Sequence, residues 1–194
     1  MSPADRHAER RARTSENIRK HALRLIFTDG YEATTVERIA AAAGVSHMTF
    51  FRHFPTKESV VLADDYDPML AAAILARPPD EPPVVAVGRA LVAGISTFGA
   101  DELDEVAKRT RLIKETPALR ARIWENEYST QQLIAGALAQ RAGLDEPDLR
   151  LRVLAAATQA ALLTALWTWA EDPAARPLPD LMAAAFAILE NKQA

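Results

Sequence analysis

Alanine supplies 39 of the 194 residues, and this abundance most narrows the folds open to the chain. Alanine has the highest helix propensity of all residues, and the leucine, glutamate and arginine that accompany it also favour helices. Stretches in which apolar and polar residues alternate, as they do in half-buried strands, are hard to find. Prolines and glycines separate segments whose apolar residues recur every three or four positions. The sequence therefore predicts an all-α protein.

The positions of the prolines and glycines predict about nine main helices, with a break in the fourth near residues 65–67. The stretch from Arg77 to Pro83 contains four prolines and is expected to be an extended connector. The predicted helix at 146–171 is apolar or small nearly all round, so we expect it to be buried on more than one side. The expected helices cover about 14–29, 34–43, 46–54, 56 to the break and beyond, 84–98, 101–115, 117–142, 146–171 and 178–191.

Composition limits the chemistry that the chain can perform. It has no cysteine, which excludes disulfides and thiolate ligands, and nothing in the sequence predicts a metal site or a cofactor. Common catalytic motifs are absent, and all four histidines lie within the first 53 residues, so an enzyme is the disfavoured interpretation. No apolar run approaches the roughly 20 residues of a membrane span. We expect a soluble, cytoplasmic protein without a membrane partner.

A helix-turn-helix is the most specific motif of the sequence. Thr34 is expected to cap its first helix, with Glu37 three positions later in a capping-box pattern. Gly44 ends that helix, and Ser46 caps a second short helix that stops before Pro55. Thr56 is expected to cap the helix that follows. Two short helices joined by a tight turn are typical of DNA-binding proteins, whose second helix enters the major groove.

Charge is divided unevenly along the chain. Residues 1–60 hold 10 Lys and Arg against 7 Asp and Glu, a net of +3, whereas residues 61–194 hold 13 against 19, a net of −6. This asymmetry indicates a DNA-binding head at 1–60 with a basic N-terminal arm, followed by a second domain at 61–194. The arm is expected to enter the minor groove or to lie along phosphates; a frayed, solvated terminus is the alternative.

The start of the second short helix is expected to read bases, and residues around it to hold phosphates. Phe50 and Phe54 are expected to face inward and to pack with Phe27 and Ile39. The candidate DNA contacts are Arg11, Arg13, Thr34, Thr35, Ser46, His47, Met48, Thr49, Phe51, His53 and Lys57.

Over residues 14–62 the sequence resembles the TetR family of transcriptional regulators. The matching stretches are Ala33-Thr-Thr-Val-Glu-Arg-Ile-Ala, Ala43-Gly-Val-Ser46 and Thr49-Phe-Phe-Arg-His-Phe-Pro-Thr-Lys-Glu58. The resemblance implies a dimeric all-helical repressor whose C-terminal domain binds a small molecule and whose fourth helix relays the signal. The family usually has tyrosine where this chain has Phe51, so the phosphate contact from that hydroxyl is absent. The continuation into Val-Val-Leu-Ala-Asp-Asp-Tyr-Asp-Pro resembles an actinobacterial branch with acyl-CoA-responsive members.

The second domain is expected to supply dimerisation and an effector pocket. Self-association is assigned to the helices at 146–171 and 178–191, unless these only fill the core of a monomer. The hypothesis is a repressor that binds a palindromic operator as a dimer and leaves it when a small apolar or amphipathic effector binds, acyl-CoA being one candidate. Control by a protein partner, or loss of the inducer, is the alternative. Aromatic residues and one amide are the pocket candidates, with packing in the core as their other explanation: Phe98, Trp124, Tyr128, Gln131, Trp167 and Trp169.

Overall fold

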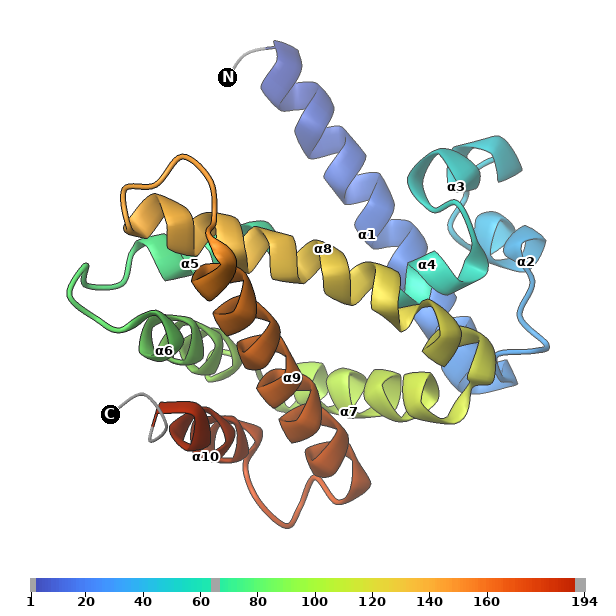
Figure 1. Cartoon of the computed structure of the whole chain (residues 1–194). Coiled ribbons are helices and arrows are strands. Elements are labelled where there is room, and N and C mark those ends of the chain that lie inside the picture. The colour runs from blue at the N-terminus through green and yellow to red at the C-terminus, as the bar shows by residue number, and fades with distance from the viewer. Residues whose placement is uncertain (1–2, 64–66, 191–194) are drawn as a thin grey trace. The chain divides into compact units, whose positions relative to one another are not determined.

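A computed structural model describes residues 3–63 and 67–190, and within them it contains ten helices and no strand (Figure 1). The all-α prediction is confirmed. The count exceeds nine because the expected fourth helix is two helices, α4 (Lys57–Leu62) and α5 (Asp67–Leu75). Part of the break predicted near residues 65–67 lies outside the described residues. The chain divides into two units, residues 1–63 and residues 64–194.

The N-terminal unit consists of α1 (Pro3–Asp29), α2 (Val36–Ala42), α3 (His47–His53) and α4. Phe50 and Phe54 are buried in its core, as predicted. Phe27 is exposed instead, because it lies about 100° around α1 from its buried neighbour Ile26. The core consists of Ile18, Ala22, Ile39, Ala40, Phe50, Phe54 and Val60.

The first helix begins much earlier than the sequence indicates. The expected start near Thr14 or Ser15 is wrong, because α1 already begins at Pro3. Thr14 does not cap a helix; its hydroxyl donates to the backbone oxygen of Arg10, one turn before it, at 2.9 Å. The basic segment that we expected to be an arm is therefore a helical extension.

Caps fix where the short helices start. The cap of α2 is Thr35 and not Thr34, since the Thr35 hydroxyl oxygen accepts from the Arg38 N–H at 3.3 Å. The predicted caps of α3 and α4 are confirmed. Ser46 Oγ accepts from the Thr49 N–H at 3.1 Å, and Thr56 forms a capping box with a residue three positions later.

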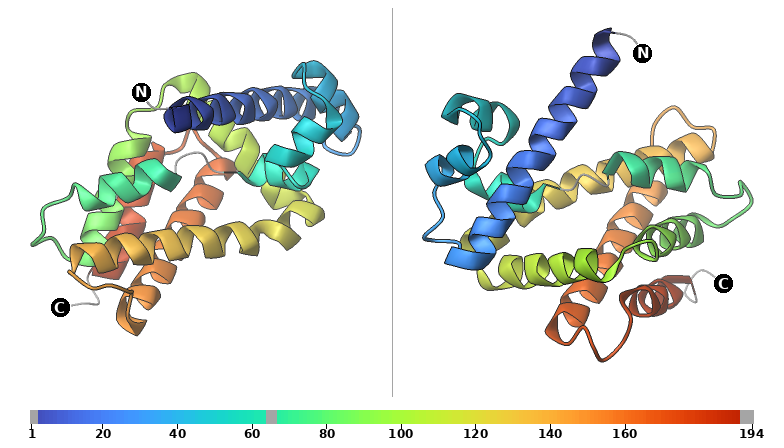
Figure 2. Two further views of the ribbon diagram at one scale, coloured as in Figure 1. Left: turned by 90° about the horizontal axis from the view of Figure 1, so that it is seen from above. Right: turned by 180° about the vertical axis from the view of Figure 1, so that it is seen from behind.

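The C-terminal unit contains α5, α6 (Pro83–Ile95), α7 (Ala100–Glu115), α8 (Pro117–Arg141), α9 (Leu149–Glu171) and α10 (Leu178–Glu190). Figure 2 shows these helices, green to red, from two further sides. Contacts join α9 to α6, α7, α8 and α10, which confirms that it is buried on more than one side. Asp148 caps α9 by accepting from the Leu151 N–H at 2.8 Å, so α9 starts three residues later than expected.

By length and composition alone α9 is apolar enough to cross a membrane, although polar residues such as Gln159 and Thr164 interrupt its apolar sequence. Its many alanines and leucines raise the mean hydropathy of an 18-residue stretch to 1.4, and 33% of that stretch is buried within the structure. A core helix of a soluble protein has the same composition when several neighbours surround it. The contacts of α9 with four helices match that case.

The proline-rich connector between α5 and α6 is non-helical, as predicted, but it turns at residues 79–80 where an extended chain is expected, and α6 already begins at Pro83. Polar groups hold the connector in place. Glu81 accepts from Arg77 Nε at 2.9 Å and from Arg89 at 2.6 Å. From α8, Arg141 donates to the backbone oxygens of Arg77 and Pro78, both at 2.6 Å. The connector is therefore tied to α6 and α8 although it has no regular structure of its own.

Candidate nucleic-acid interface

The turn between α2 and α3 sets the direction of α3, the helix expected to read bases. Gly44 has a φ of +66°, a left-handed conformation that side chains disfavour. The N–H of Val45 donates to the Ala40 oxygen at 3.0 Å, and that of Gly44 to the Ala41 oxygen at 3.2 Å. These bonds end α2 in the manner of a Schellman motif, and α3 starts two residues later. A helix-turn-helix is present where the sequence predicts it.

The first turn of α3 is open to solvent. His47 and Met48 are exposed, and the ring of Phe51 packs edge-on against His47 with centroids 4.6 Å apart. His47 Nε2 also lies 3.3 Å from a Glu37 carboxylate oxygen. Backbone hydrogen bonding at Glu37 lowers the pKa of this carboxyl, and the Thr35 hydroxyl and His47 lower it further. The imidazole is therefore held over the α3 surface by a carboxylate and an aromatic ring.

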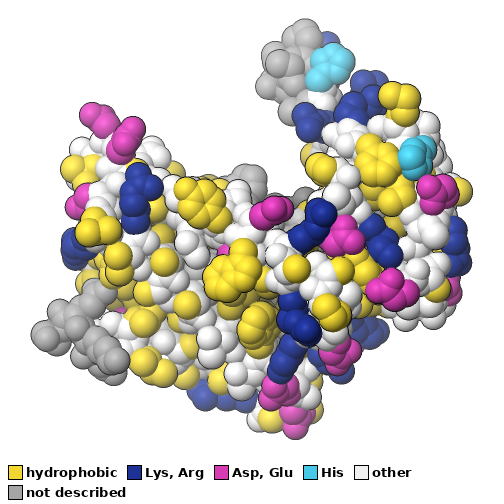
Figure 3. Space-filling model, turned by 45° about the vertical axis from the view of Figure 1, so that its right-hand side comes forward, with side chains coloured by type: hydrophobic (Ala, Val, Ile, Leu, Met, Phe, Trp, Pro, Cys, Tyr) yellow, Lys and Arg dark blue, Asp and Glu magenta, His cyan; other side chains and the backbone are white. Residues whose placement is uncertain are grey.

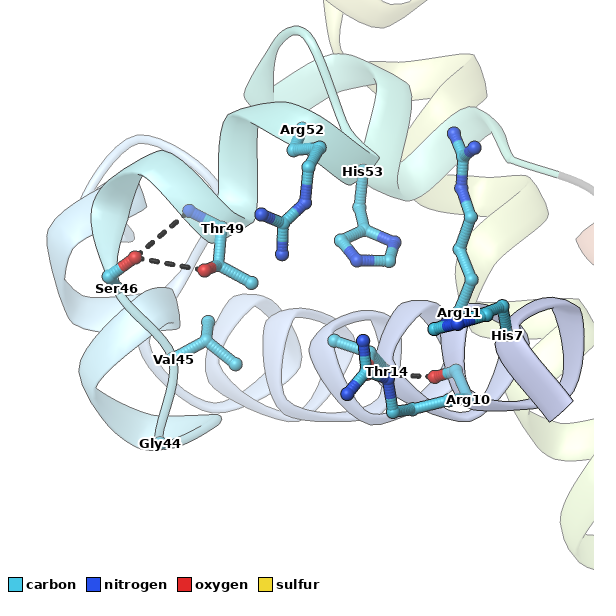
Figure 4. A pocket seen from close by; sticks show the side chains of 10 residues that line it. All are labelled: His7, Arg10, Arg11, Thr14, Gly44, Val45, Ser46, Thr49, Arg52 and His53. Atoms are coloured by element: carbon cyan, nitrogen blue, oxygen red, sulfur yellow. Dashed lines mark hydrogen bonds between the residues drawn. The ribbon is translucent and has the colours of Figure 1, made fainter. Parts of the chain in front are cut away.

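A basic groove lies between α1 and α3 (Figure 4). It has a volume of about 630 Å³. Figure 4 shows the side chains of Arg52 and His53 extending from α3 toward α1, which contributes Arg10, Arg11 and His7. No carboxylate lines the groove among the described residues. Its lining residues are His7, Arg10, Arg11, Thr14, Gly44, Val45, Ser46, Thr49, Arg52 and His53.

The electrostatics of this groove favour an anion. Partial burial lowers the pKa of His53, and the nearby guanidinium groups of Arg11 and Arg52 lower it further. A cationic neighbourhood that disfavours a proton on imidazole favours a negatively charged ligand for the same reason. Hydroxyls of Ser46 and Thr49, 2.9 Å apart, lie at one side of the groove and add polar hydrogen atoms. The arrangement matches the chemistry of a phosphodiester backbone.

The residues predicted to contact phosphates differ in whether their side chains are accessible to DNA. Thr34 is fully buried and donates to the Gly30 oxygen at 2.8 Å, so it cannot reach DNA, whereas Thr35 is exposed. The ammonium group of Lys57 donates to the backbone oxygen of Tyr31 at 2.7 Å and lies 3.9 Å from the centre of the Tyr31 ring. An ammonium has three N–H donors, so this contact leaves donors for a phosphate.

Sequence reasoning also misses contributors to the groove. His7 and Arg52 line it but are not among the predicted contacts, and Arg10 is predicted only as part of the basic arm. Arg13, which is among them, lies outside it and lines a neighbouring recess of about 540 Å³ with Arg6, Glu9, Arg10, Thr14, Asn17 and Val45. The spacing of His7, Arg11 and Thr14 places them on one face once the segment is recognised as a helix.

The predicted effector residues do not form one enclosed set. Trp124 and Tyr128 are exposed over 74% and 63% of their surface, so within the single chain they are not enclosed between helices. Phe98, Gln131 and Trp167 are half-buried. Trp169 is buried in a core cluster with Ala107, Ala165, Leu178, Met182 and Phe186. Figure 3 shows hydrophobic side chains spread over one face of the C-terminal unit, and Lys and Arg side chains on both units.

An all-helical chain with a helix-turn-helix, and beside it a basic groove whose described lining contains no carboxylate, belongs to the class of helix-turn-helix transcriptional regulators. Comparisons with known families give the assignment within that class. Residues 18–63 match the family described as bacterial regulatory proteins, tetR family, and residues 81–194 match the MftR C-terminal domain. The chain belongs to the TetR family.

Individual relatives agree with this assignment. The transcriptional regulator TcmR of Streptomyces glaucescens is 35% identical over 156 residues, which cover 76% of this chain and 69% of TcmR. A Mycobacterium tuberculosis protein described as a mycofactocin biosynthesis regulator, MftR, is 27% identical over 191 residues, 97% of this chain and 96% of that protein. These relatives are regulators, which confirms that the chain is a transcription factor and not an enzyme.

Solved structures share the fold. FadR of Thermus thermophilus, a TetR-family repressor in complex with lauroyl-CoA, superposes with a TM-score of 0.55 and 26% identity. The superposition covers 90% of this chain and 92% of FadR. The predicted family and fold are thus confirmed by sequence and by structure.

Proposed function

We propose that the chain is a repressor that binds a near-palindromic operator as a homodimer in the cytoplasm and leaves it when a small molecule occupies its C-terminal unit. The observation that supports DNA binding most directly is the basic groove between α1 and α3, which contains five basic side chains and no carboxylate among its described lining residues. DNA presents phosphates on both sides of the major groove, so a helix that reads bases needs cationic neighbours at its edges.

In this arrangement α3 reads base edges and the groove holds one strand. His47, Met48 and Thr49 lie in the first turn of α3, where side chains reach the floor of the major groove. Arg11 and His53 contact the phosphate backbone from the groove, and Lys57 contacts it from the first position of α4. Met48 supplies an exposed apolar group that suits the methyl group of thymine.

Binding is tested by fluorescence anisotropy with duplexes from the region upstream of the gene that encodes the chain. The wild type should bind one such duplex with an affinity far above that for a shuffled duplex, and Met48→Ala should weaken binding to the specific duplex alone. Arg24→Ala is the matched control for loss of a positive charge, because Arg24 is exposed on α1 outside the groove. Equal affinity for both duplexes would contradict the proposal.

Dimerisation is assigned to α9 and α10. Leu149 and Val153 are exposed on α9 one turn apart, and Ala160 and Thr164 continue the same face with small side chains. Ile188 is exposed on α10. A face that is apolar and small lets two copies of a helix approach closely across a two-fold axis. The two DNA-binding units of such a dimer then match the two half-sites of an operator.

Light scattering during size-exclusion chromatography tests this assignment. The wild type should elute as a dimer, and Ala160→Arg should convert it to a monomer that binds the operator weakly. Ala93→Arg, at an exposed position of α6, is the matched control and should leave the dimer intact. A wild type that is monomeric at micromolar concentration would overturn the assignment.

Control by an effector rests on the family and on the C-terminal match. FadR is described in complex with lauroyl-CoA, and SmeT, with a TM-score of 0.58, in complex with triclosan. Acyl-CoAs and other hydrophobic compounds are therefore the first effectors to screen, with half-buried Phe98, Gln131 and Trp167 as candidate contacts. Control by a protein partner gains if no compound both stabilises the protein and releases the operator.

A further inference from the structure

A buried polar pair joins α8 to α9 inside the C-terminal unit. Glu127 and Gln159 are each only 5% exposed, and the Gln159 Nε2 group donates to Glu127 Oε2 at 2.7 Å. Carboxylates and amides are rarely buried to this extent unless they are paired. The amide oxygen of Gln159, Oε1, is buried and accepts no hydrogen bond from the residues that the structure describes. The pair therefore ends in an acceptor that still requires a donor.

Exchanging the amide oxygen and nitrogen does not remove this requirement. Beside an ionised Glu127, an amide of Gln159 rotated by 180° would turn its oxygen to the carboxylate, and two acceptors would oppose each other at 2.7 Å. The orientation in which the amide N–H group meets the carboxylate is the one that chemistry favours. The amide oxygen of Gln159 therefore lacks a hydrogen-bond donor among the described residues, and this lowers the stability of the folded chain until a ligand supplies one.

Neighbouring hydroxyls do not supply the donor. Thr158, which is fully buried next to Gln159, donates to the Ala155 oxygen at 2.9 Å. Thr130, one turn from Glu127, donates to the Asn126 oxygen at 3.3 Å. In each of these two hydrogen bonds the acceptor is a backbone oxygen of the same helix. One turn from Gln159, Ala155 belongs to a core cluster that is entirely apolar.

We infer that Glu127 and Gln159 form the polar end of the effector site and select ligands whose buried end is a hydrogen-bond donor, an ammonium or a hydroxyl group on an apolar body. A donor at this position bonds to Gln159 Oε1 and approaches the carboxylate of Glu127. A carboxylate or phosphate end would instead meet two oxygen acceptors, the Gln159 amide oxygen and the Glu127 carboxylate. This inference rests on the proposed control by a small molecule and specifies its chemistry.

The net charge of the C-terminal part supports the same choice. Residues 61–194 carry 13 Lys and Arg against 19 Asp and Glu, a net of −6, so the field of this part of the chain attracts cations. An acyl-CoA could place its apolar chain between helices, but neither its thioester nor its phosphates offers a donor to Gln159. Donor-bearing hydrophobic compounds therefore fit this pair better than fatty acids or their thioesters.

A matched series of probes tests the selection. 1-Octylamine, 1-octanol and octanoate share one apolar chain and differ only in the end group. Binding is measured by calorimetry and by the shift in melting temperature of the full chain. Octylamine and octanol should bind the wild type, octylamine more tightly, and octanoate should bind at least about tenfold more weakly than octylamine.

Two variants test whether Gln159 and Glu127 are the residues that select the end group of the ligand. Gln159→Leu should weaken both octanol and octylamine by about tenfold, whereas Glu127→Gln should weaken octylamine selectively because it removes the charge and keeps an amide partner. Gln140→Leu makes the same exchange at an exposed position of α8 and should change neither affinity. A purely structural pair would alter the melting temperature of the free variants and leave the order of the probes unchanged.

Three results would overturn the inference: octanoate binding as tightly as octylamine, equal probe affinities for Gln159→Leu and Gln140→Leu, or no binding of any probe to the wild type. Operator binding by the ligand-free protein is measured in parallel. If the operator is bound and the probes are not, the inference fails and the regulator function stands. If the probes bind as expected but never release the operator, the site stands and its role in control fails.

Discussion

Arg52 allows a quantitative test of the basic groove, because the salt dependence of DNA binding counts phosphate contacts. Arg52 is exposed in the last turn of α3 and lines the groove together with Arg11. Each phosphate contact contributes about 0.9 to the slope of log K against log salt. A dimer carries two heads, so Arg52→Ala should reduce the slope by about 1.8.

This slope difference has a measurable consequence. Between about 50 mM and about 200 mM salt, a fourfold change, the wild type should lose about twelvefold more affinity than Arg52→Ala. Anisotropy titrations with one operator duplex at four salt concentrations give both slopes. Because Arg52 is outside the core of the head, melting curves of the variant should match the wild type within about 0.5 kcal/mol.

Arg24→Ala removes the same charge from the same unit outside the groove. Its slope should stay near that of the wild type, which separates a local contact from a general loss of positive charge. The reasoning would be refuted if Arg52→Ala kept the wild-type slope, or if both variants reduced it equally. Either result would show that the groove does not hold a phosphate.

Three further predictions concern packing and protonation. Gly88→Ala should destabilise the chain by about 1–3 kcal/mol in urea titrations, because the new Cβ would lie 2.9 Å from the ring of Phe186. Hydrogen bonding to Arg77 lowers the pKa of Glu81 to about 2 from 4.5, so its stabilisation is present above pH 4.5 and is lost as pH falls toward 2; Glu81→Gln should flatten melting temperature against pH across that window. The pKa of His53 is lowered by partial burial and two arginines, and phosphate favours its protonated form, so operator affinity should rise as pH falls from about 7 to about 5, and less so in His53→Gln.

Helix positions are predictable where a single residue decides the local conformation. Gly30, Gly44 and Gly143 all have positive φ at the ends of predicted helices. Ser46 and Thr56 cap α3 and α4 as predicted, since each is a favoured capping residue with no competing cap directly beside it. These choices are local, and the sequence carries the full information for them.

Adjacent candidates cannot be separated in the same way. Thr34 and Thr35 have nearly the same capping ability, and only the packed structure shows which one is buried. The hydroxyl of Thr34 bonds to the Gly30 oxygen inside the turn, which leaves Thr35 to cap α2. The choice depends on how the turn after α1 folds against the core. No local propensity predicts that packing.

The start of α1 is misplaced by sequence reasoning because Thr14, a residue type that often caps helices, resembles a boundary. Residues 3–13 contain four arginines and three alanines and no helix breaker after Pro3, which suits a first helical position. Thr14 is accommodated inside the helix by bonding back to the Arg10 oxygen. The error matters for function, since it hides the face from which His7 and Arg11 meet α3 across the groove.

Aromatic residues give the weakest guidance to the effector site. Trp124 and Tyr128 share a helical face, as their spacing requires, but spacing does not say whether that face is buried, and both are exposed. The polar pair of Glu127 and Gln159 lies on α8 and α9 and is separated by 32 residues. No motif in the sequence connects the two, so only the packing of the helices brings them together.

The likeness to FadR concerns the apolar body of an effector, whereas the polar pair of Glu127 and Gln159 concerns its end group. FadR is described in complex with lauroyl-CoA, a ligand that carries a long apolar chain. End-group selection depends instead on the few polar groups that a pocket buries, because an unmet acceptor penalises every ligand that brings no donor. Two members of one fold family can therefore share a preference for apolar bodies and differ in the end group they accept. In this chain the buried amide oxygen of Gln159 makes that difference, and it favours a donor.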